Sequence, residues 1–263
     1  MRYLRLILKF LKASAQQEMA YSFNFFIQLI YSLLNLGVGL AGLGILYNQI
    51  ETIQGWDYAS TLALLGIYLF VSAVRGLFIG PSLEALAGMD GEIMAGKFDF
   101  TLLRPINLQF LASFRYWQPF ALLDLLLGVG VIIRAITLPG SSVTFPNILT
   151  FGLTLTIGLT VLYASLLAFS SLVFWSPGFM FTWVFDGLFQ LARYPVGLYP
   201  AWSRLVLTWI IPVGVITTIP AKALTGIVMK EEIYTGLVLA GLLYAGASLL
   251  FSFSVKRYAS ASS

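Results

Sequence analysis

The chain has 263 residues, of which 59% are hydrophobic and only 10% are charged, with a net charge of +4. Soluble domains carry about 25% charged residues, so this composition indicates an integral membrane protein and excludes a soluble domain. The sequence contains neither cysteine nor histidine, which excludes disulfides, thiol nucleophiles, imidazole bases and the usual zinc and iron–sulfur sites. We therefore expect no cofactor, and we attribute the positive charge to contact with anionic lipid rather than with nucleic acid.

An amphipathic helix is predicted at the start of the chain, over residues 1–20. Its basic residues recur three or four positions apart and therefore share one helical face: Arg2, Arg5, Lys9 and Lys12. A cleavable signal peptide is the alternative, because Ala13-Ser14-Ala15 resembles a cleavage site. However, Lys9 and Lys12 interrupt the apolar core that a signal peptide needs. We expect a helix that lies on the cytoplasmic leaflet.

Six apolar stretches are predicted to cross the bilayer, for which about 20 residues are needed. They cover approximately residues 23–47, 59–80, 112–136, 147–174, 178–198 and 232–254. The connections between them are short, apart from the segments that follow the second and fifth spans. The predicted fold class is therefore an all-α polytopic membrane protein, with residues 1–263 forming a single transmembrane domain.

Residues 203–224 are predicted to enter and leave the membrane from the outer face as a re-entrant hairpin. The uncharged run from Leu205 to Ala221 is short for a span and contains Pro212 and Pro220. Six spans keep both termini on the cytoplasmic side, together with the basic residues that follow the second span, as the positive-inside rule favours. We expect a multi-pass protein of the cell's inner (plasma) membrane.

The longest internal segment with the polarity of water-exposed protein is GEIMAGKFDFTLLRP, residues 91–105. Its first eight residues match a phosphate-binding loop up to the last position, where Phe98 replaces the required hydroxyl. Phe98 cannot bind Mg²⁺, and a membrane span and a short polar helix precede the match where a strand is needed. The match is therefore accidental. If ATP drives this protein, a partner protein must bind the ATP. This loop is the one long cytoplasmic loop that we expect such a partner to contact.

Three motifs carry a resemblance to a known family: GEIMAGKFDFTLLRP, ARYPVGLYP at 192–200 and IPVGVITTIPAKAL at 211–224. In this order they resemble ABC-2-type transporter permeases, in particular the daunorubicin-exporter-like subfamily. The resemblance covers nearly the whole chain. It implies the permease subunit of an ATP-binding-cassette exporter, which has no nucleotide site and is not itself an enzyme. Such a subunit pairs with a second copy or a sister permease, and separate ATPase subunits drive the pair.

The resemblance also implies that the loop after the second span forms a short cytoplasmic coupling helix, which docks on the ATPase. The residues expected to make this contact are Glu92, Lys97, Phe98, Asp99, Phe100 and Arg104. In the same family, the segment after the fifth span forms a re-entrant hairpin at the outer mouth, as predicted above from length alone.

Five polar or charged residues fall inside predicted spans: Arg75, Asp124, Asp186, Gln190 and Arg193. A charge at the middle of a bilayer costs about 2.5–3.5 kcal/mol, so such residues face a partner charge or a wet cavity. Two interpretations stay open. In the first, Arg75 pairs with Asp124 or Asp186 and holds the helices together. In the second, Asp186 and Gln190 line the translocation path and favour a cationic or amphipathic cargo, or a lipid-like one.

Two other functions compete with the permease. An ion-coupled secondary transporter using Asp124 and Asp186 is the main alternative, although no repeat of the first half of the chain is found in the second. An intramembrane aspartyl protease using the same two carboxylates is the other, but the glycine-rich surroundings of such dyads are missing. Export or import, and the identity of the cargo, do not follow from the residues.

Overall fold

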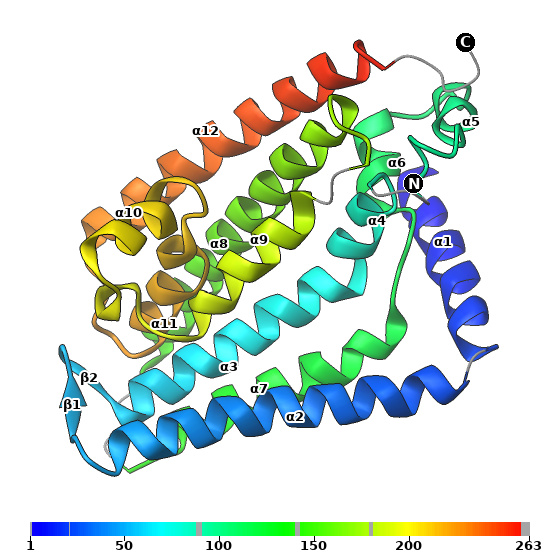
Figure 1. The fold of residues 1–263 in the computed structure, drawn as a ribbon. Helices are drawn as coiled ribbons and strands as arrows, with labels where there is room; N and C mark the ends of the chain where they lie inside the picture. The colour runs from blue at the N-terminus through cyan, green and yellow to red at the C-terminus, as the bar shows by residue number, and fades with distance from the viewer. Residues whose placement is uncertain (1, 21, 88–90, 140–142, 179–180, 259–263) are drawn as a thin grey trace.

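The computed structural model describes residues 2–20, 22–87, 91–139, 143–178 and 181–258, and these are mostly helical (Figure 1). The helices are α1 (Arg2–Met19), α2 (Ser22–Tyr47), α3 (Tyr58–Val74), α4 (Gly80–Glu84), α5 (Phe98–Leu102), α6 (Leu108–Phe114), α7 (Leu122–Ile136), α8 (Phe145–Ser171), α9 (Phe181–Phe189), α10 (Ala201–Trp209), α11 (Ile219–Leu224) and α12 (Lys230–Val255). Two very short antiparallel strands, β1 (Thr52–Ile53) and β2 (Trp56–Asp57), form a hairpin that was not predicted.

Five stretches of the described residues are long and apolar enough to cross a membrane. They are Phe23–Tyr47, Tyr58–Glu84, Pro119–Ile136, Phe145–Phe174 and Lys230–Val255. The second and fourth have 61% and 67% of their most apolar part buried, against 17% to 22% in the other three. The helices α3 and α8 therefore form the core, and α2, α7 and α12 present apolar side chains outward. This supports the prediction of an all-α polytopic membrane protein.

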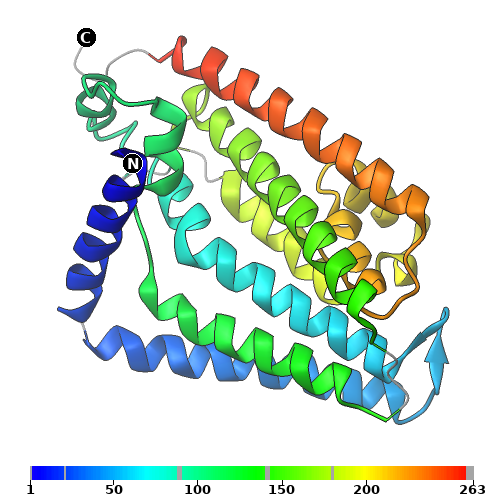
Figure 2. The same cartoon turned by 180° about the vertical axis from the view of Figure 1, so that it is seen from behind.

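The bundle has two distinct ends, which Figures 1 and 2 show clearly. At one end, here called the α5 end, α5 and α6 lie near the start of α1 and the end of α12. Ring contacts join them, since Tyr3 lies 4.7 Å from Phe110 and Phe98 lies 5.2 Å from Tyr258, measured between ring centroids. At the opposite end, here called the hairpin end, β1 and β2 lie near α10 and α11. The loop 91–105 and the segment 203–224 therefore occupy opposite ends of the molecule.

Glycines allow the helices of the core to approach closely. A Cβ atom at Gly66 of α3 would lie 2.8 Å from the backbone nitrogen of Ile132 on α7, and one at Gly128 of α7 would lie 2.6 Å from the backbone nitrogen of Phe70. Each helix thus inserts its backbone into the space left by a glycine of the other, as small residues permit in membrane proteins. On α8, Gly158 meets the carbonyl of Ile216 in the same way.

The predicted third span, 112–136, is interrupted. The helix α6 ends at Phe114, and α7 begins only at Leu122, after a 3₁₀ turn at Pro119–Ala121. Two backbone N–H groups of this break donate hydrogen bonds to side chains that are far away in the sequence. Trp117 donates to Ser14 Oγ at 3.1 Å, and Phe120 donates to Glu18 Oε2 at 3.0 Å. Side chains of α1 therefore satisfy the backbone donors of the break. The membrane-spanning part of this segment starts near Pro119.

The predicted fifth span, 178–198, is not a single long helix. The helix α9 ends at Phe189 and continues only as a 3₁₀ turn to Arg193. Tyr194 then takes an extended conformation, with φ −123° and ψ 152°, as expected for the residue before a proline. The chain reaches the start of α12 through α10, a π-helix at Gly214–Thr218 and α11. Hydropathy alone predicted one span over 178–198, but the helical structure ends before Pro195.

Candidate functional site

A polar cavity of about 310 Å³ lies inside the bundle, between α2, α3, α7 and α9. Its polar lining comes from Gln28, Tyr31, Asn35, Tyr68, Ser72, Arg75, Gln118, Asp124, Asp186 and Gln190. Four of the five polar residues singled out within predicted spans thus meet in one cavity. The fifth, Arg193, lies at its margin, where it donates hydrogen bonds to Asn35 Oδ1 at 2.9 Å and to the Tyr68 hydroxyl at 3.3 Å.

Arg75 is the central charge of this cavity. It begins a π-helix, Arg75–Ile79, that interrupts the regular turns between α3 and α4, a feature that is frequent at functional sites. Its guanidinium pairs with Asp186 on α9, with 2.7 Å between Nη2 and Oδ1, and with Glu84 at the end of α4. One guanidinium therefore bridges two carboxylates, one in the cavity and one at the α5 end.

Asp124 does not pair with Arg75. Its Oδ2 accepts a hydrogen bond from Gln28 Nε2 on α2 at 2.7 Å, so its charge is solvated by a neutral amide. Because α7 begins at Leu122, Asp124 lies in the first turn of that helix rather than well inside a span. Together with Asp186 and with Glu84 outside the cavity, it gives the region three carboxylates, against the two guanidiniums of Arg75 and Arg193.

Some polar atoms of the cavity have no hydrogen-bond partner among the described residues. These are Ser72 Oγ, Arg75 Nε and Asp186 Oδ1, all buried; the 2.7 Å contact of Asp186 Oδ1 with Arg75 Nη2 is an ion pair without hydrogen-bond geometry. Buried polar atoms normally bind protein, water or ligand. The cavity therefore suits water or a polar group of a cargo. The described residues contain no group of His, Cys, Asp and Glu that could hold a metal ion.

The sequence analysis identified Gln190 but missed the other neutral polar residues of this site, such as Gln28 and Asn35. Gln28 and Asn35 are seven residues apart, and thus on one face of α2. This polar stripe on an otherwise apolar span was the signal that could have revealed them. Glu84 was outside the predicted spans, and nothing in the pattern joins it to Arg75.

The loop 91–105 is anchored to the bundle by a buried carboxylate. Glu92 is only 7% exposed. Its Oε1 accepts hydrogen bonds from Arg115 Nη1 at 2.7 Å and from the Tyr116 hydroxyl at 2.6 Å. Burial raises the pKa of Tyr116 to about 12, and the hydrogen bond to Glu92 acts in the same direction. Tyr116 therefore stays protonated and donates to Glu92 at physiological pH.

The short helix α5 is anchored by Phe98, which is fully buried. Its ring meets those of Phe174 and Tyr258 edge-on, at 5.3 and 5.2 Å between centroids. Glu92 and Phe98, two of the six residues expected to contact a partner, thus point into the protein and hold the loop in place. The side chains of Lys97, Phe100 and Arg104 are exposed, and that of Asp99 is half-buried.

Several apolar side chains of this loop are exposed, among them that of Phe100. Met94, Phe100 and Leu103 are 47%, 69% and 82% exposed. Since the loop lies beyond the ends of the long apolar helices, these side chains form an apolar tip, flanked by Lys97 and Arg104. The apolar tip, defined here as Met94, Phe100 and Leu103, has the character of a docking surface.

The glycines of the accidental phosphate-loop match have structural roles. Gly96 has a φ of 67°, a conformation that glycine adopts without strain. At Gly91 a Cβ atom would lie 2.3 Å from the carbonyl oxygen of Ala87, so any side chain there would clash. Backbone geometry thus explains both glycines without a nucleotide.

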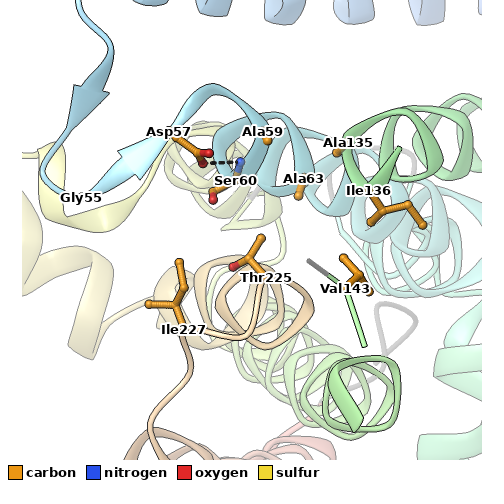
Figure 3. A pocket seen from close by; sticks show the side chains of 10 residues that line it. All are labelled: Gly55, Asp57, Ala59, Ser60, Ala63, Ala135, Ile136, Val143, Thr225 and Ile227. Carbon is orange, nitrogen blue, oxygen red and sulfur yellow. Dashed lines mark hydrogen bonds between the residues drawn. The ribbon is translucent and has the colours of Figure 1, made fainter. Parts of the chain in front are cut away.

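A smaller hollow of about 290 Å³ lies at the hairpin end, where β2, α3, α7 and the end of α11 meet (Figure 3). Its walls are mostly small or apolar side chains, among them Ala63 and Ala135. The Asp57 carboxylate on its rim accepts a hydrogen bond from the Ser60 backbone at 2.9 Å and caps α3. The Asp57 carboxylate is thus engaged in local structure, so this hollow is a weaker candidate than the charged cavity.

These features define a multi-pass membrane protein with a charged intramembrane cavity and an anchored loop at one end. The chain matches the model of the ABC-2 family transporter protein over residues 33–262 and belongs to that family. It is therefore a permease component of ABC transport, and the predicted ABC-2 resemblance is confirmed. The narrower daunorubicin-exporter-like resemblance stays a prediction. Neither the curated proteins nor the solved structures contain a match.

Proposed function

We propose that this chain is the permease subunit of an ATP-binding-cassette exporter, powered by separate ATPase subunits. The observation that carries the proposal is the loop 91–105. It is held rigidly to the bundle by Glu92 and Phe98, yet it presents the apolar tip to the outside. A rigid loop with exposed apolar and basic side chains is suited to receive a push from another protein and to pass it into the membrane domain.

Co-purification tests this proposal. The chain is expressed with the ATPase encoded beside it, and the complex is isolated in detergent. We expect the two proteins to co-purify, with ATP hydrolysis by the complex and none by the chain alone. Ion-driven transport by the isolated chain without ATP would instead favour the secondary transporter. That alternative keeps one supporting observation, since Asp124 and Asp186 line the same cavity.

The docking surface gives a second test. The change Leu103→Glu places a charge on the apolar tip, where the side chain is 82% exposed. We expect it to weaken ATPase binding by about 2 kcal/mol, roughly a thirtyfold rise in Kd, as for a central interface residue. The matched control is Ile50→Glu, which charges an exposed apolar side chain (51%) near the hairpin end. Equal ATPase binding by both variants would contradict the assignment. Gly96 is unsuitable for such a test because of its positive φ.

We propose further that the charged cavity is part of the translocation path and that a second permease copy or a sister permease completes that path. The carboxylates of Asp124 and Asp186 favour a cargo with a cationic group. The apolar side chains that surround them favour an amphipathic molecule. Gln190, exposed beside Asp186 on the same chain segment, supplies a neutral amide for the polar part of such a cargo.

The proposed topology has six crossings of the inner (plasma) membrane, the five long apolar stretches and a sixth made by α9 with the 3₁₀ turn that follows it. It puts the α5 end and both termini in the cytoplasm and residues 203–224 at the outer mouth. Because the chain has no cysteine, single cysteines report the side directly. We expect Ala201→Cys, exposed at the start of α10, to react with an impermeant maleimide added to intact cells. Leu103→Cys is expected to react only after the cells are opened. The reverse pattern would invert the topology. Thr217 is unsuitable because it is fully buried.

A further inference from the structure

An apolar groove lies between α10, the segment 214–219 and the first half of α12. Figure 1 shows α10 and α11 beside the first half of α12. The volume of the groove is about 620 Å³, within the range of about 300–1,000 Å³ that ligand sites occupy. Leu207 on α10, Val215 and Ile219 around the π-helix Gly214–Thr218, and Leu239 on α12 form its walls. It shares none of the residues of the charged cavity, and the proposed function makes no use of it.

The groove opens toward the space that lipid occupies. Its outer wall is a ridge of three α12 side chains spaced four residues apart, Tyr234, Val238 and Leu242. They are 68%, 61% and 68% exposed. Since α12 is one of the helices long and apolar enough to span a membrane, hydrocarbon chains surround this ridge.

The length of the groove corresponds to one leaflet. Along α12 it runs from Glu232 to Leu242, which is ten residues and so about 15 Å. The hydrocarbon core of a bilayer is about 30 Å thick, so the groove is as long as half of it. At its shallow end Glu232 pairs with Lys222 at 2.6 Å, and this pair marks the level of lipid head groups.

One hydroxyl in the groove has no partner among the described residues, the buried Oγ1 of Thr218. Thr208 and Thr235 donate to their own helices, at 2.6 Å to Arg204 O and at 2.7 Å to Glu231 O. Thr218 precedes Lys222 by four residues and therefore lies one helical turn deeper than the ion pair. An acceptor is needed there, at the depth where the ester carbonyls of a phospholipid lie below its head group.

We propose that this groove binds an acyl chain of a membrane glycerophospholipid. The ester carbonyl of the lipid accepts a hydrogen bond from Thr218, and its head group lies beside the Lys222–Glu232 pair. The acyl chain fills the groove between residues 203–224 and α12, above the contact that Gly236 makes with Val215 and Ile219. The lipid thereby supports the position of residues 203–224 against the bundle.

Native mass spectrometry of the full chain, stripped of lipid in detergent and titrated with dioleoylphosphatidylethanolamine, tests the proposal. The change Leu242→Trp fills the deep end of the groove. We expect it to weaken binding of this lipid by about tenfold, the effect of overpacking a site. The matched control is Leu249→Trp, seven residues further along α12, equally exposed at 72% but outside the groove. It is expected to bind as the native chain does.

The hydroxyl gives an independent measurement. Thr218→Val is expected to weaken binding of the ester lipid by about fivefold, the effect of one lost hydrogen bond. The dialkyl ether analogue has no carbonyl, so the native chain and Thr218→Val should bind it equally. Thr208→Val, whose hydroxyl is already bonded within α10, should leave binding of both lipids unchanged.

Three results would overturn the proposal. The first is lipid binding by Leu242→Trp that equals that of Leu249→Trp. The second is an equal loss of ester and ether lipid on Thr218→Val. The third is a change of oligomeric state by Leu242→Trp with lipid binding unchanged, which would assign the groove to a second copy of the chain. None of these results depends on an ATPase, so the proposal fails or stands separately from the transport function.

Discussion

The change Arg75→Gln is expected to reduce the stability of the protein by about 1–3 kcal/mol, between the values for an exposed and for a fully buried ion pair, because Arg75, Glu84 and Asp186 are only partly buried. Arg75 is the one guanidinium among the described residues that contacts both Glu84 and Asp186. Without it, two carboxylates stay unpaired at one end of a membrane bundle, near a third at Asp124. Thermal unfolding in detergent and the yield of inserted protein measure the effect.

The change Asp186→Asn is the matched comparison. It removes one charge from the same contact, but it leaves no charged side chain of that contact without a partner. Arg75 keeps Glu84 as its partner, so we expect assembly to survive. If Asp186 lies on the path, transport of cationic cargo falls selectively in this variant while transport of neutral cargo is retained. Adding Asp186→Asn to Arg75→Gln should recover part of the lost stability.

A native-like melting temperature of the Arg75→Gln variant would show that the ion pairs of Arg75 contribute nothing to the stability of the protein. Arg134→Gln serves as a control at an exposed position near the end of α7, where surface changes usually stay within about 0.5 kcal/mol. Full transport of every cargo by Asp186→Asn would remove the cavity from the proposed path, and equal loss of all cargoes would assign Asp186 a structural role.

Hydropathy predicted the elements that are both apolar and uninterrupted. The predicted 23–47, 147–174 and 232–254 correspond closely to α2, α8 and α12. The prediction failed where an apolar stretch contains a backbone break. Arg115, Gln118 and Pro119 mark the break between α6 and α7 in the sequence, but a hydropathy average over the whole stretch does not respond to them. The partners that stabilise the break, Ser14 and Glu18, lie about a hundred residues away in the sequence.

The candidate site was predictable in its charged residues and in Gln190. Ionisable residues are conspicuous in an apolar stretch, so Arg75, Asp124 and Asp186 could be identified. Which carboxylate pairs with Arg75 depends on how α3, α7 and α9 pack, and sequence patterns do not give this. The same limit applies to the loop 91–105. Its overall polarity suggested that Glu92 faces water, whereas tertiary packing brings Arg115 and Tyr116 to it.

The second large effect is expected at Phe98. The change Phe98→Ala removes a fully buried ring that packs against Phe174 and Tyr258, at a cost of about 3–5 kcal/mol for such a truncation. Because Phe174 and Tyr258 follow the ends of α8 and α12, the ring of Phe98 attaches α5 to these two helices. We therefore expect the loop 91–105 to detach locally while the long helices stay folded.

Phe100→Ala is the matched control for this change, since both residues lie on α5 and lose the same atoms. Phe100 is 69% exposed, so its truncation should alter stability by no more than about 0.5 kcal/mol. Amide hydrogen exchange distinguishes the two. Phe98→Ala should raise exchange across 91–105 by orders of magnitude and leave α3 and α8 protected, whereas Phe100→Ala should match the native pattern.

The same pair separates anchoring from docking. Phe100→Ala is expected to weaken ATPase binding because it truncates the apolar tip, although the loop keeps its shape. Phe98→Ala is expected to leave the apolar side chains present but no longer fixed, so that a bound ATPase hydrolyses ATP without driving transport. If Phe98→Ala retains both native exchange and coupled transport, the loop is not held through this ring, and the force that the loop transmits must pass through Glu92 and Arg115 instead.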